Sequence, residues 1–206
     1  MVLINPQDYH RTVDILTQSL TENGWQVTNF GYEFLPDYIK SALQSKYNIT
    51  SLYLRTKPDL LATRDSRFND FETFLIEAKD LTEKATQTGN LAVEALPWFI
   101  ARHLLKINVN YLYAIESPES NVYLIKPDLT PFSDISTIYL PNLHKEYFAK
   151  NVLSGLKSAF PKIIFNLIQM QVKSGFSQDP YLLVPFSLIA KYGRELNQFA
   201  KWGWKN

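Results

Sequence analysis

Residues 57–79, "KPDLLATRDSRFNDFETFLIEAK", combine two apolar runs with three ionisable side chains. The runs "KPDLLAT" and "ETFLIEAK" are rich in aliphatic and aromatic residues and are separated by a polar segment, which predicts two consecutive strands. Asp59 lies near the start of the first strand, and Glu77 and Lys79 lie at the end of the second. Side chains alternate between the faces of a strand, so Glu77 and Lys79 share their face with Leu75. The pattern therefore predicts charged groups on a strand that is otherwise suited to burial.

A pairing of these two strands would bring the acidic residues together. If the strands are antiparallel neighbours joined by a turn near Phe68, Asp59 and Glu77 lie about equally far from the turn and face each other. Two carboxylates that close repel unless a proton or a cation lies between them. A hard divalent cation such as Mg²⁺ resolves the conflict, because it binds a few carboxylate oxygens and keeps positions for water and phosphate oxygens. With Lys79 beside the attacking water, such a site favours metal-assisted hydrolysis of a phosphodiester.

The same residues carry a resemblance to a known family. "PD" at residues 58–59 followed by "EAK" at residues 77–79 resembles the signature of the PD-(D/E)xK nuclease superfamily, which includes type II restriction endonucleases and Holliday-junction resolvases. The "EAK" triplet is the only E-x-K in the sequence. Two other "PD" pairs, at residues 36–37 and 127–128, have no E-x-K behind them.

The resemblance implies a role for each residue of the motif. Asp59 and Glu77 would be metal ligands, the backbone carbonyl of Ala78 would be another ligand, and Lys79 would be the catalytic lysine. The implied cofactor is Mg²⁺, with Mn²⁺ as a substitute. The implied activity is that of a metal-dependent nuclease, and we expect a DNA endonuclease, with RNA cleavage and exonuclease activity as less favoured alternatives. Cutting both strands of a duplex requires two sites, so a symmetric homodimer is expected.

The family often supplies one further acid from a helix before the sheet. Glu33, at the start of the second predicted helix, is the candidate, and Glu22 and Asp14 compete with it. A glutamate at a helix start is also favoured simply by the helix dipole. The resemblance therefore leaves the identity of this acid open.

The resemblance implies an α/β, restriction-endonuclease-like fold, in which helices flank a mixed central sheet in the order α-β-β-β-α-β. The sequence pattern agrees with that order. It predicts helices over 7–22, 36–46 and 81–106, the last bent or split by Pro97, and strands over 25–30, 50–56, 57–63, 72–79, 108–116 and 121–127.

The resemblance covers about residues 7–126. We expect one domain over residues 1–206, with a nuclease-like core over about 1–126 and a largely helical extension over 127–206. Within the extension, the segments 146–160, 161–173 and 182–204 look mainly helical, and the start of the last suits a strand equally well.

A simpler interpretation of the motif needs no metal. Asp59 would cap a turn, and Glu77 and Lys79 would form an ion pair on a solvated strand face, contributing well under about 1 kcal/mol. Leu75 argues against it, because an exposed strand more often alternates cleanly with polar residues. Under this interpretation the chain would be a non-catalytic nucleic-acid-binding or assembly protein.

Other residues are candidates for contact with nucleic acid. In the helix predicted after the motif, Gln87, Asn90 and Glu94 either present polar groups to the site or are exposed, and Lys84 is a candidate for phosphate contact. Residues 145–206 hold nine Lys and Arg against three Asp and Glu, whereas residues 1–144 hold 12 against 17. The basic residues near the chain end are Lys191, Arg194, Lys201 and Lys205, interleaved with Tyr192, Phe199, Trp202 and Trp204. They suit phosphate and base contacts. Equally, the tryptophans suit anchoring of the chain end to the core or to a second subunit.

The composition and the absence of certain motifs exclude several other classes of protein and site. The absence of cysteine excludes disulfides and thiolate metal sites and fits a cytoplasmic location. No apolar window is long enough for a membrane span, and no signal peptide is expected. The three histidines are His10, His103 and His144, and they have no metal-ligand spacing. The glycine-containing signatures of serine hydrolases and phosphate-binding loops do not occur.

Overall fold

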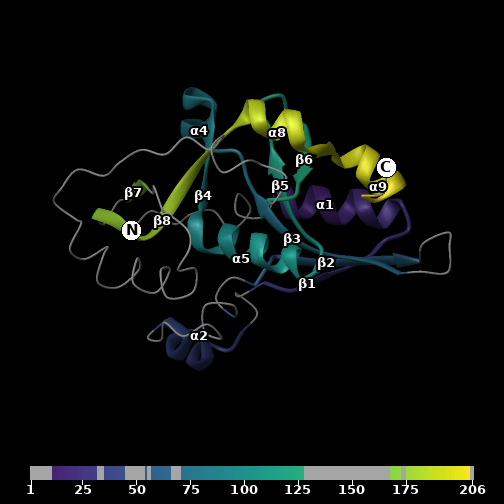
Figure 1. The fold of residues 1–206 in the computed structure, drawn as a ribbon, viewed down its shortest axis with the longest axis horizontal. Helices are drawn as coiled ribbons and strands as arrows, with labels where there is room; N and C mark the ends of the chain where they lie inside the picture. Colours follow the sequence, from purple (N-terminus) through teal and green to yellow (C-terminus); the bar gives the residue numbers. More distant parts are fainter. Residues whose placement is uncertain are drawn as a thin grey trace.

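A six-stranded sheet forms the centre of the computed structural model, which describes residues 11–31, 35–44, 54, 57–65, 71–127, 168–172 and 175–204 (Figure 1). The sheet contains β1 (Gln26–Asn29), β2 (Leu60–Asp65), β3 (Phe71–Lys79), β5 (Tyr111–Glu116), β6 (Val122–Ile125) and β9 (Arg194–Glu195). A second sheet contains β4 (Asn90–Glu94), β7 (Ile168–Val172) and β8 (Gly175–Pro185). The helices of the described residues are α1 (Arg11–Glu22), α2 (Asp37–Gln44), α4 (Glu83–Thr88), α5 (Ala95–Lys106), α8 (Phe186–Tyr192) and α9 (Leu196–Trp202).

The large sheet is mixed. Its strand order is β1-β2-β3-β5-β6-β9, and every neighbouring pair is antiparallel except β3 and β5, which are parallel. Antiparallel strands need only a short turn, whereas the parallel pair is joined by a crossover that contains α4, β4 and α5. The expected mixed α/β fold is thereby confirmed, as is the hairpin of β5 and β6. The helices predicted over 7–22 and 36–46 are present as α1 and α2 within the described residues.

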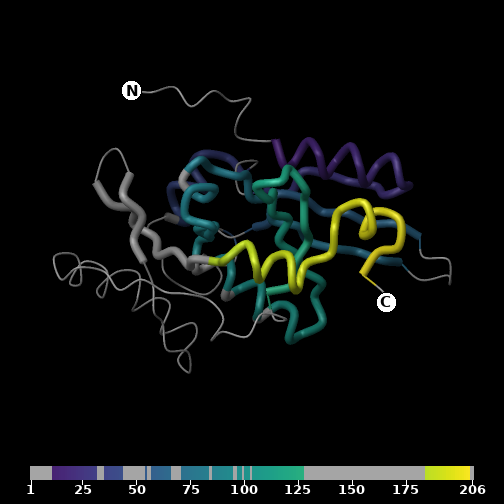
Figure 2. Tube along the Cα trace, turned by 90° about the horizontal axis from the view of Figure 1, so that it is seen from above, coloured from purple at the N-terminus to yellow at the C-terminus, as the bar shows by residue number. Residues whose placement is uncertain are grey.

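Helices and the second sheet cover the two faces of the large sheet, as the view from above shows for α1 and α5 (Figure 2). On one face, α1 buries Leu16 and Leu20, one helical turn apart, against strand residues such as Phe74 and Ile76. The opposite face is covered by α5, α8 and β4, which contribute side chains such as Trp98. The two faces thus belong to two separate apolar clusters, and residues 75, 77 and 79 point toward the α5 side.

The predicted helix over 81–106 is wrong. The chain forms α4, then β4, then α5, and α4 ends at Gly89, whose φ of 67° lies in the left-handed region. Residues 90–94 pair with β8, a contact between distant segments that local periodicity does not report. Pro97 neither bends nor splits a helix, because it lies in the first turn of α5, where its missing N–H has no helical partner to lose.

The largely helical C-terminal extension is also corrected. Residues 168–172 and 175–185 form an antiparallel pair of strands, β7 and β8. The helix predicted over 161–173 is therefore wrong at β7, whereas the strand left open at the start of 182–204 is present at the end of β8. Short apolar runs fit both states, and strand pairing decides between them. The predicted strand over 50–56 is described only at Leu54, which is helical, so β1 completes the three-strand meander. The segment 146–160 lies outside the described residues.

The chain end packs on the core of the molecule. β9 pairs with β6, and Leu196 and Phe199 of α9 are buried in the same cluster as α1. The indole N–H of Trp25 donates to the carbonyl of Ala200 at 2.9 Å, and Trp25 stacks on Phe199 with ring centroids 5.2 Å apart. The chain end is therefore anchored to the core, but of the tryptophans expected to anchor it, Trp204 packs against this cluster and Trp202 is 60% exposed.

Candidate functional site

The strands β2 and β3 bring Asp59 and Glu77 together as predicted. Their antiparallel register pairs Leu60 with Ile76, and one further step places Asp59 opposite Glu77. Asp59 lies just before β2, and its carboxylate Oδ2 accepts a hydrogen bond from the backbone N–H of Ala78 at 2.7 Å. This bond fixes the Asp59 side chain against the end of β3.

Pro58 has a specific consequence for the backbone of Ala78. One step further in the register places Pro58 opposite Ala78, where an ordinary residue would exchange two hydrogen bonds with its partner. The N–H and the C=O of a strand residue point to the same neighbour, so the Ala78 carbonyl lies on the Asp59 side. Pro58 has no N–H to donate to that carbonyl. The carbonyl oxygen predicted as a ligand therefore receives no hydrogen bond from Pro58.

Glu77 and Lys79 form an ion pair that is largely shielded from water. The Lys79 Nζ lies 2.8 Å from the Glu77 Oε1, and the side chains are only 22% and 10% exposed, respectively. Both point to the face that α5 covers, beside the apolar cluster that Leu75 joins. The simpler interpretation predicted this ion pair, and it is present. It also predicted that the pair lies on a solvated face, and that part is wrong.

Glu94 is a third carboxylate beside this pair. Its Oε2 lies 3.5 Å from the Lys79 Nζ, and its side chain is 38% exposed. Glu94 is the last residue of β4 and precedes the first turn of α5, so the strand and the helix together set its position. Its orientation toward the site was one of two predicted alternatives, and the structure confirms that one. By contrast, Gln87 bonds Glu83 within α4, and Asn90 bonds the carbonyl of Thr88.

Burial and neighbouring charges shift the protonation of the pair. Burial raises the pKa of Glu77 from its usual 4.5 to about 7; the charge of Lys79 lowers it, and the charges of Asp59 and Glu94 raise it. Burial alone lowers the pKa of Lys79, but the charges of Glu77, Glu94 and Asp59 outweigh it and raise that pKa. Lys79 therefore remains a cation at neutral pH, surrounded by carboxylates.

The donor set fits a hard divalent cation in part. The register places the carboxylates of Asp59 and Glu77 and the backbone of Ala78 at the same end of the paired strands, and hard cations prefer oxygen ligands. The register places the two acids opposite each other, and the charge of Asp59 adds to the rise in the pKa of Glu77. Among the described residues, no three His, Cys, Asp or Glu side chains form a ready-made metal cluster. A cation here would therefore use the carbonyl, with water and substrate oxygens completing its coordination.

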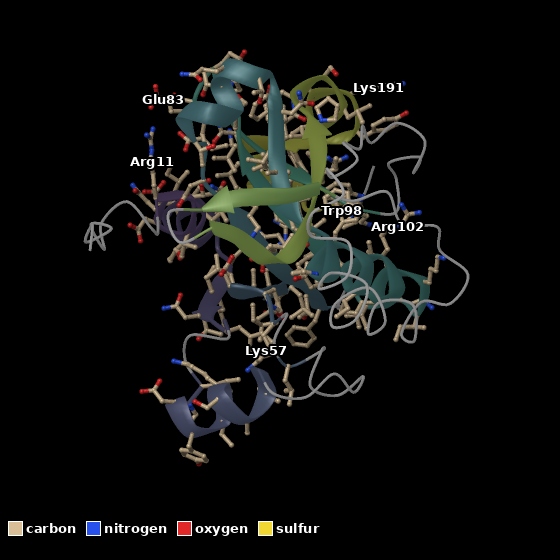
Figure 3. The ribbon with its side chains drawn as sticks, turned by 90° about the vertical axis from the view of Figure 1, so that its left-hand side faces the viewer. Arg11, Lys57, Glu83, Trp98, Arg102 and Lys191 are labelled. Carbon is tan, nitrogen blue, oxygen red and sulfur yellow. The ribbon has the colours of Figure 1, made fainter. Side chains whose placement is uncertain are left out.

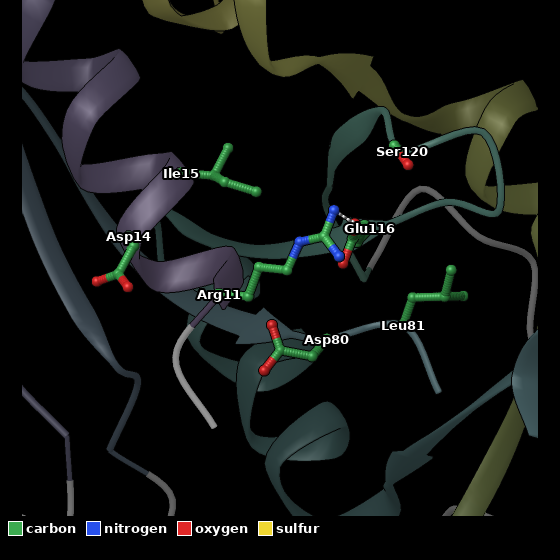
Figure 4. Close-up of a pocket in the computed structure, with 7 residues that line it drawn as sticks. All are labelled: Arg11, Asp14, Ile15, Asp80, Leu81, Glu116 and Ser120. Carbon is green, nitrogen blue, oxygen red and sulfur yellow. Dashed lines mark ion pairs between the residues drawn. The ribbon is translucent and has the colours of Figure 1, made fainter. Parts of the chain in front are cut away.

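The competing positions for a further acid are not at this site. Glu22 accepts a hydrogen bond from Gln18 on the exposed side of α1, and Glu33 lies outside the described residues. Asp14 lines a different pocket of about 490 Å³, with Arg11, Asp80 and Glu116 (Figure 4). There, Arg11 pairs with the buried Glu116 at 3.0 Å, and Asp80 accepts the backbone N–H of Thr12.

The basic residues proposed for nucleic-acid contact differ in their surroundings. Lys191 and Lys201 are exposed, on α8 and α9. Arg194 donates to the carbonyl of Gly203 at 2.6 Å and lies over the ring of Trp204, so it is engaged within the chain. The backbone of Lys84 belongs to α4, but its side chain and all of Lys205 lie outside the described atoms. His10, the His103 side chain and His144 also lie outside them.

Comparisons of the chain with protein-family models, with curated protein sequences and with solved structures found no match. Among the described helices, none has the length and apolar character required to cross a membrane. The resemblance to the PD-(D/E)xK nucleases therefore depends on the motif residues and on the order of the elements around them.

Proposed function

We propose that this protein is a metal-dependent nuclease of the PD-(D/E)xK type, acting as a DNA endonuclease with Mg²⁺ or Mn²⁺. One observation carries the proposal: Asp59, Glu77 and Lys79 converge at the ends of paired strands. Burying the ion pair of Glu77 and Lys79 beside a third carboxylate, Glu94, costs desolvation free energy. Stability of the strand therefore does not explain this arrangement. The order α1, β1, β2, β3, α5, β5 agrees with the order that the family implies, with α2, α4 and β4 as insertions.

Each residue would have a distinct task in hydrolysis. Asp59 and Glu77 would hold the cation with their carboxylate oxygens, and Ala78 would add its carbonyl. The cation would polarise the phosphate and make a water molecule more acidic. Because Lys79 keeps its proton, it would act beside the attacking water and the phosphate as a positive charge and hydrogen-bond donor, not as the base.

The proposal predicts that Glu77→Gln and Lys79→Met abolish Mg²⁺-dependent DNA cleavage, with a loss of about 100-fold or more. Glu77→Gln removes an anionic oxygen from the proposed ligand set, and Lys79→Met removes the positive charge at nearly constant volume. Purified protein would be incubated with Mn²⁺ or Mg²⁺ and a panel of plasmid, linear, branched and single-stranded DNA. Cleavage rates would be measured from the products.

Glu116→Gln is the matched control. Glu116 is also a buried glutamate in an ion pair at a strand end, but it faces Arg11 in the other pocket. We expect this variant to cleave at the wild-type rate. Unchanged cleavage by Glu77→Gln would refute the assignment, and circular dichroism would show whether each variant is folded.

The alternative function is a non-catalytic nucleic-acid-binding or assembly protein with a nuclease-like fold. The observation that favours it is the ion pair between Glu77 and Lys79, in which the two charges balance each other without a metal ion. This alternative predicts no cleavage products and no rise in melting temperature on addition of Mn²⁺. Binding of nucleic acid without turnover would support it against the nuclease.

The proposed endonuclease would act on both strands of a duplex as a homodimer. Analytical ultracentrifugation of the wild-type protein with and without duplex DNA would test this point. If the protein is a monomer that nicks one strand at a time, the nuclease proposal stands and the homodimer is excluded.

A further inference from the structure

Three buried hydrogen-bond donors lie together under α5 without an acceptor. The indole Nε1 of Trp98 and the hydroxyl groups of Tyr111 and Tyr113 have no hydrogen-bond partner among the described residues. All three side chains are 0% exposed. Buried polar groups nearly always have a partner, so these three donors call for an acceptor that the present arrangement of the described side chains does not supply.

The three side chains form one cluster. The ring centroids of Trp98 and Tyr113 are 4.8 Å apart, and those of Tyr111 and Tyr113 are 5.9 Å apart. The tyrosines come from β5, and Trp98 comes from α5, where Figure 3 labels it one turn before Arg102. The cluster therefore lies between the helix and the sheet face that carries the proposed site.

The tyrosines adjoin the carboxylates of that site. In the parallel register of β3 and β5, Tyr113 is the partner of Glu77, and Tyr111 is the partner of Leu75. Burial raises the pKa of both tyrosine hydroxyls, and the charges of Glu77, Asp59 and Glu94 add to the rise. The parallel register and the shared sheet face place both tyrosine side chains beside Glu77.

We propose that Tyr111 and Tyr113 are positioning residues that donate hydrogen bonds to the carboxylate of Glu77, directly or through one trapped water, when Glu77 binds a divalent cation. One carboxylate oxygen of Glu77, Oε1, lies 2.8 Å from the Nζ of Lys79. A carboxylate offers about four acceptor positions, so it has room for a further donor. Metal-binding side chains usually have such outer hydrogen-bond partners, whose removal weakens metal affinity by about 10- to 100-fold. The inference rests on the proposed metal site.

The test is Mn²⁺ binding to Tyr111→Phe and Tyr113→Phe, measured by isothermal titration calorimetry, together with melting temperatures without metal. We expect each variant to bind Mn²⁺ at least about tenfold more weakly. We also expect its metal-free melting temperature to stay the same or rise, because the substitution removes an unpartnered buried hydroxyl. A residue with a purely structural role would lower the melting temperature and leave the affinity unchanged.

Tyr123→Phe is the matched control, because Tyr123 of β6 packs against the same apolar cluster and its hydroxyl is not among the buried unpartnered groups. It should keep wild-type affinity. Wild-type affinity in both Tyr111→Phe and Tyr113→Phe would overturn this inference and leave the nuclease proposal intact. Absence of Mn²⁺ binding by the wild-type protein would instead overturn the metal site itself, and the inference with it.

Discussion

Glu77 has a protonation state that depends on its partners in the fold. It is a nearly buried acid two residues from a cation, with two other carboxylates within electrostatic reach. Burial favours the neutral form of Glu77, while Lys79 favours the charged form. A bound cation would act in the same direction as Lys79. A proton, Lys79 and the proposed metal ion would therefore compete for one carboxylate.

This competition predicts the pH dependence of stability. The pKa of Glu77 is raised from 4.5 to about 7, so the folded chain holds this proton more tightly than the unfolded chain does. The contribution to the free energy of unfolding is thus fully present below about pH 4.5 and is lost as the pH rises through 7. Lys79 is protonated in both states throughout this window and adds no slope.

Glu77→Gln should remove this dependence of the free energy of unfolding on pH, because glutamine mimics the protonated form of Glu77. Relative to the wild type, the variant should gain stability between pH 4.5 and about pH 8, as measured by urea unfolding at several pH values. Carboxylates remote from Glu77 titrate equally in both proteins and cancel in the difference. A constant difference between the two proteins across this range would contradict the raised pKa.

Single residues of the site differ in how far the sequence predicts them. The pairing of Asp59 with Glu77 follows from their equal distances from one turn, because an antiparallel hairpin is a local structure. Glu94 was predicted only as one of two alternatives, since its position depends on the pairing of β4 with β8. Nothing in the sequence predicts the proposed hydrogen bonds of Tyr111 and Tyr113, because "YLYAI" is an ordinary pattern for a buried strand.

At the scale of the elements, local patterns predict what local contacts stabilise. The spacing of Leu16 and Leu20 is enough to predict α1, and alternating or short apolar runs predict β2 and β3. The pattern fails at residues 90–94, where a strand forms because it pairs with the distant β8, and at residues 168–172, which pair with the neighbouring β8. In those segments tertiary pairing overrides helical periodicity.

Gly89 determines where α4 ends and β4 begins. Its φ is +67°, a conformation in which an L side chain is strained, although a Cβ at this position would meet none of the described residues within 4 Å. Gly89→Ala should therefore lower the free energy of unfolding by about 1 kcal/mol. Gly89→Asn should cost less, because asparagine tolerates this region better. Equal losses in both variants, measured by thermal unfolding, would rule out backbone strain as the cause.

At the scale of the whole molecule, the core does not end with the predicted nuclease-like segment at residue 126. Leu196, Phe199 and Ala200 are buried in the same cluster as α1, and Ile189 belongs to the cluster beneath α5. The sequence predicts that the chain end is apolar enough to be anchored. It does not predict the site of anchoring, because β9 is only two residues long and pairs at the far edge of the sheet.

Arg64 joins the hairpin of β2 and β3 to the chain end. Its guanidinium pairs with Glu72 at 2.8 Å and donates to the carbonyls of Ala200 and Lys201 at the end of α9. Arg64→Met should lower the free energy of unfolding by about 3 kcal/mol, because it leaves Glu72 buried without its partner.

The double variant Arg64→Met/Glu72→Met is the control for this prediction. It leaves no unpaired charge, so it should lose less stability than Arg64→Met alone in urea unfolding. A larger loss in the double variant would show that packing, and not the buried charge, is what Arg64 provides.

The packing of α9 against α1 has a consequence for how the chain acquires its shape. Trp25 finds its hydrogen-bond acceptor at Ala200, 175 residues later. During synthesis from the N-terminus, part of the apolar surface of α1, β1, β2 and β3 therefore stays exposed until α9 has been made. Maturation in the cell is expected to be slow and to favour chaperone assistance, since contacts so distant along the chain form last.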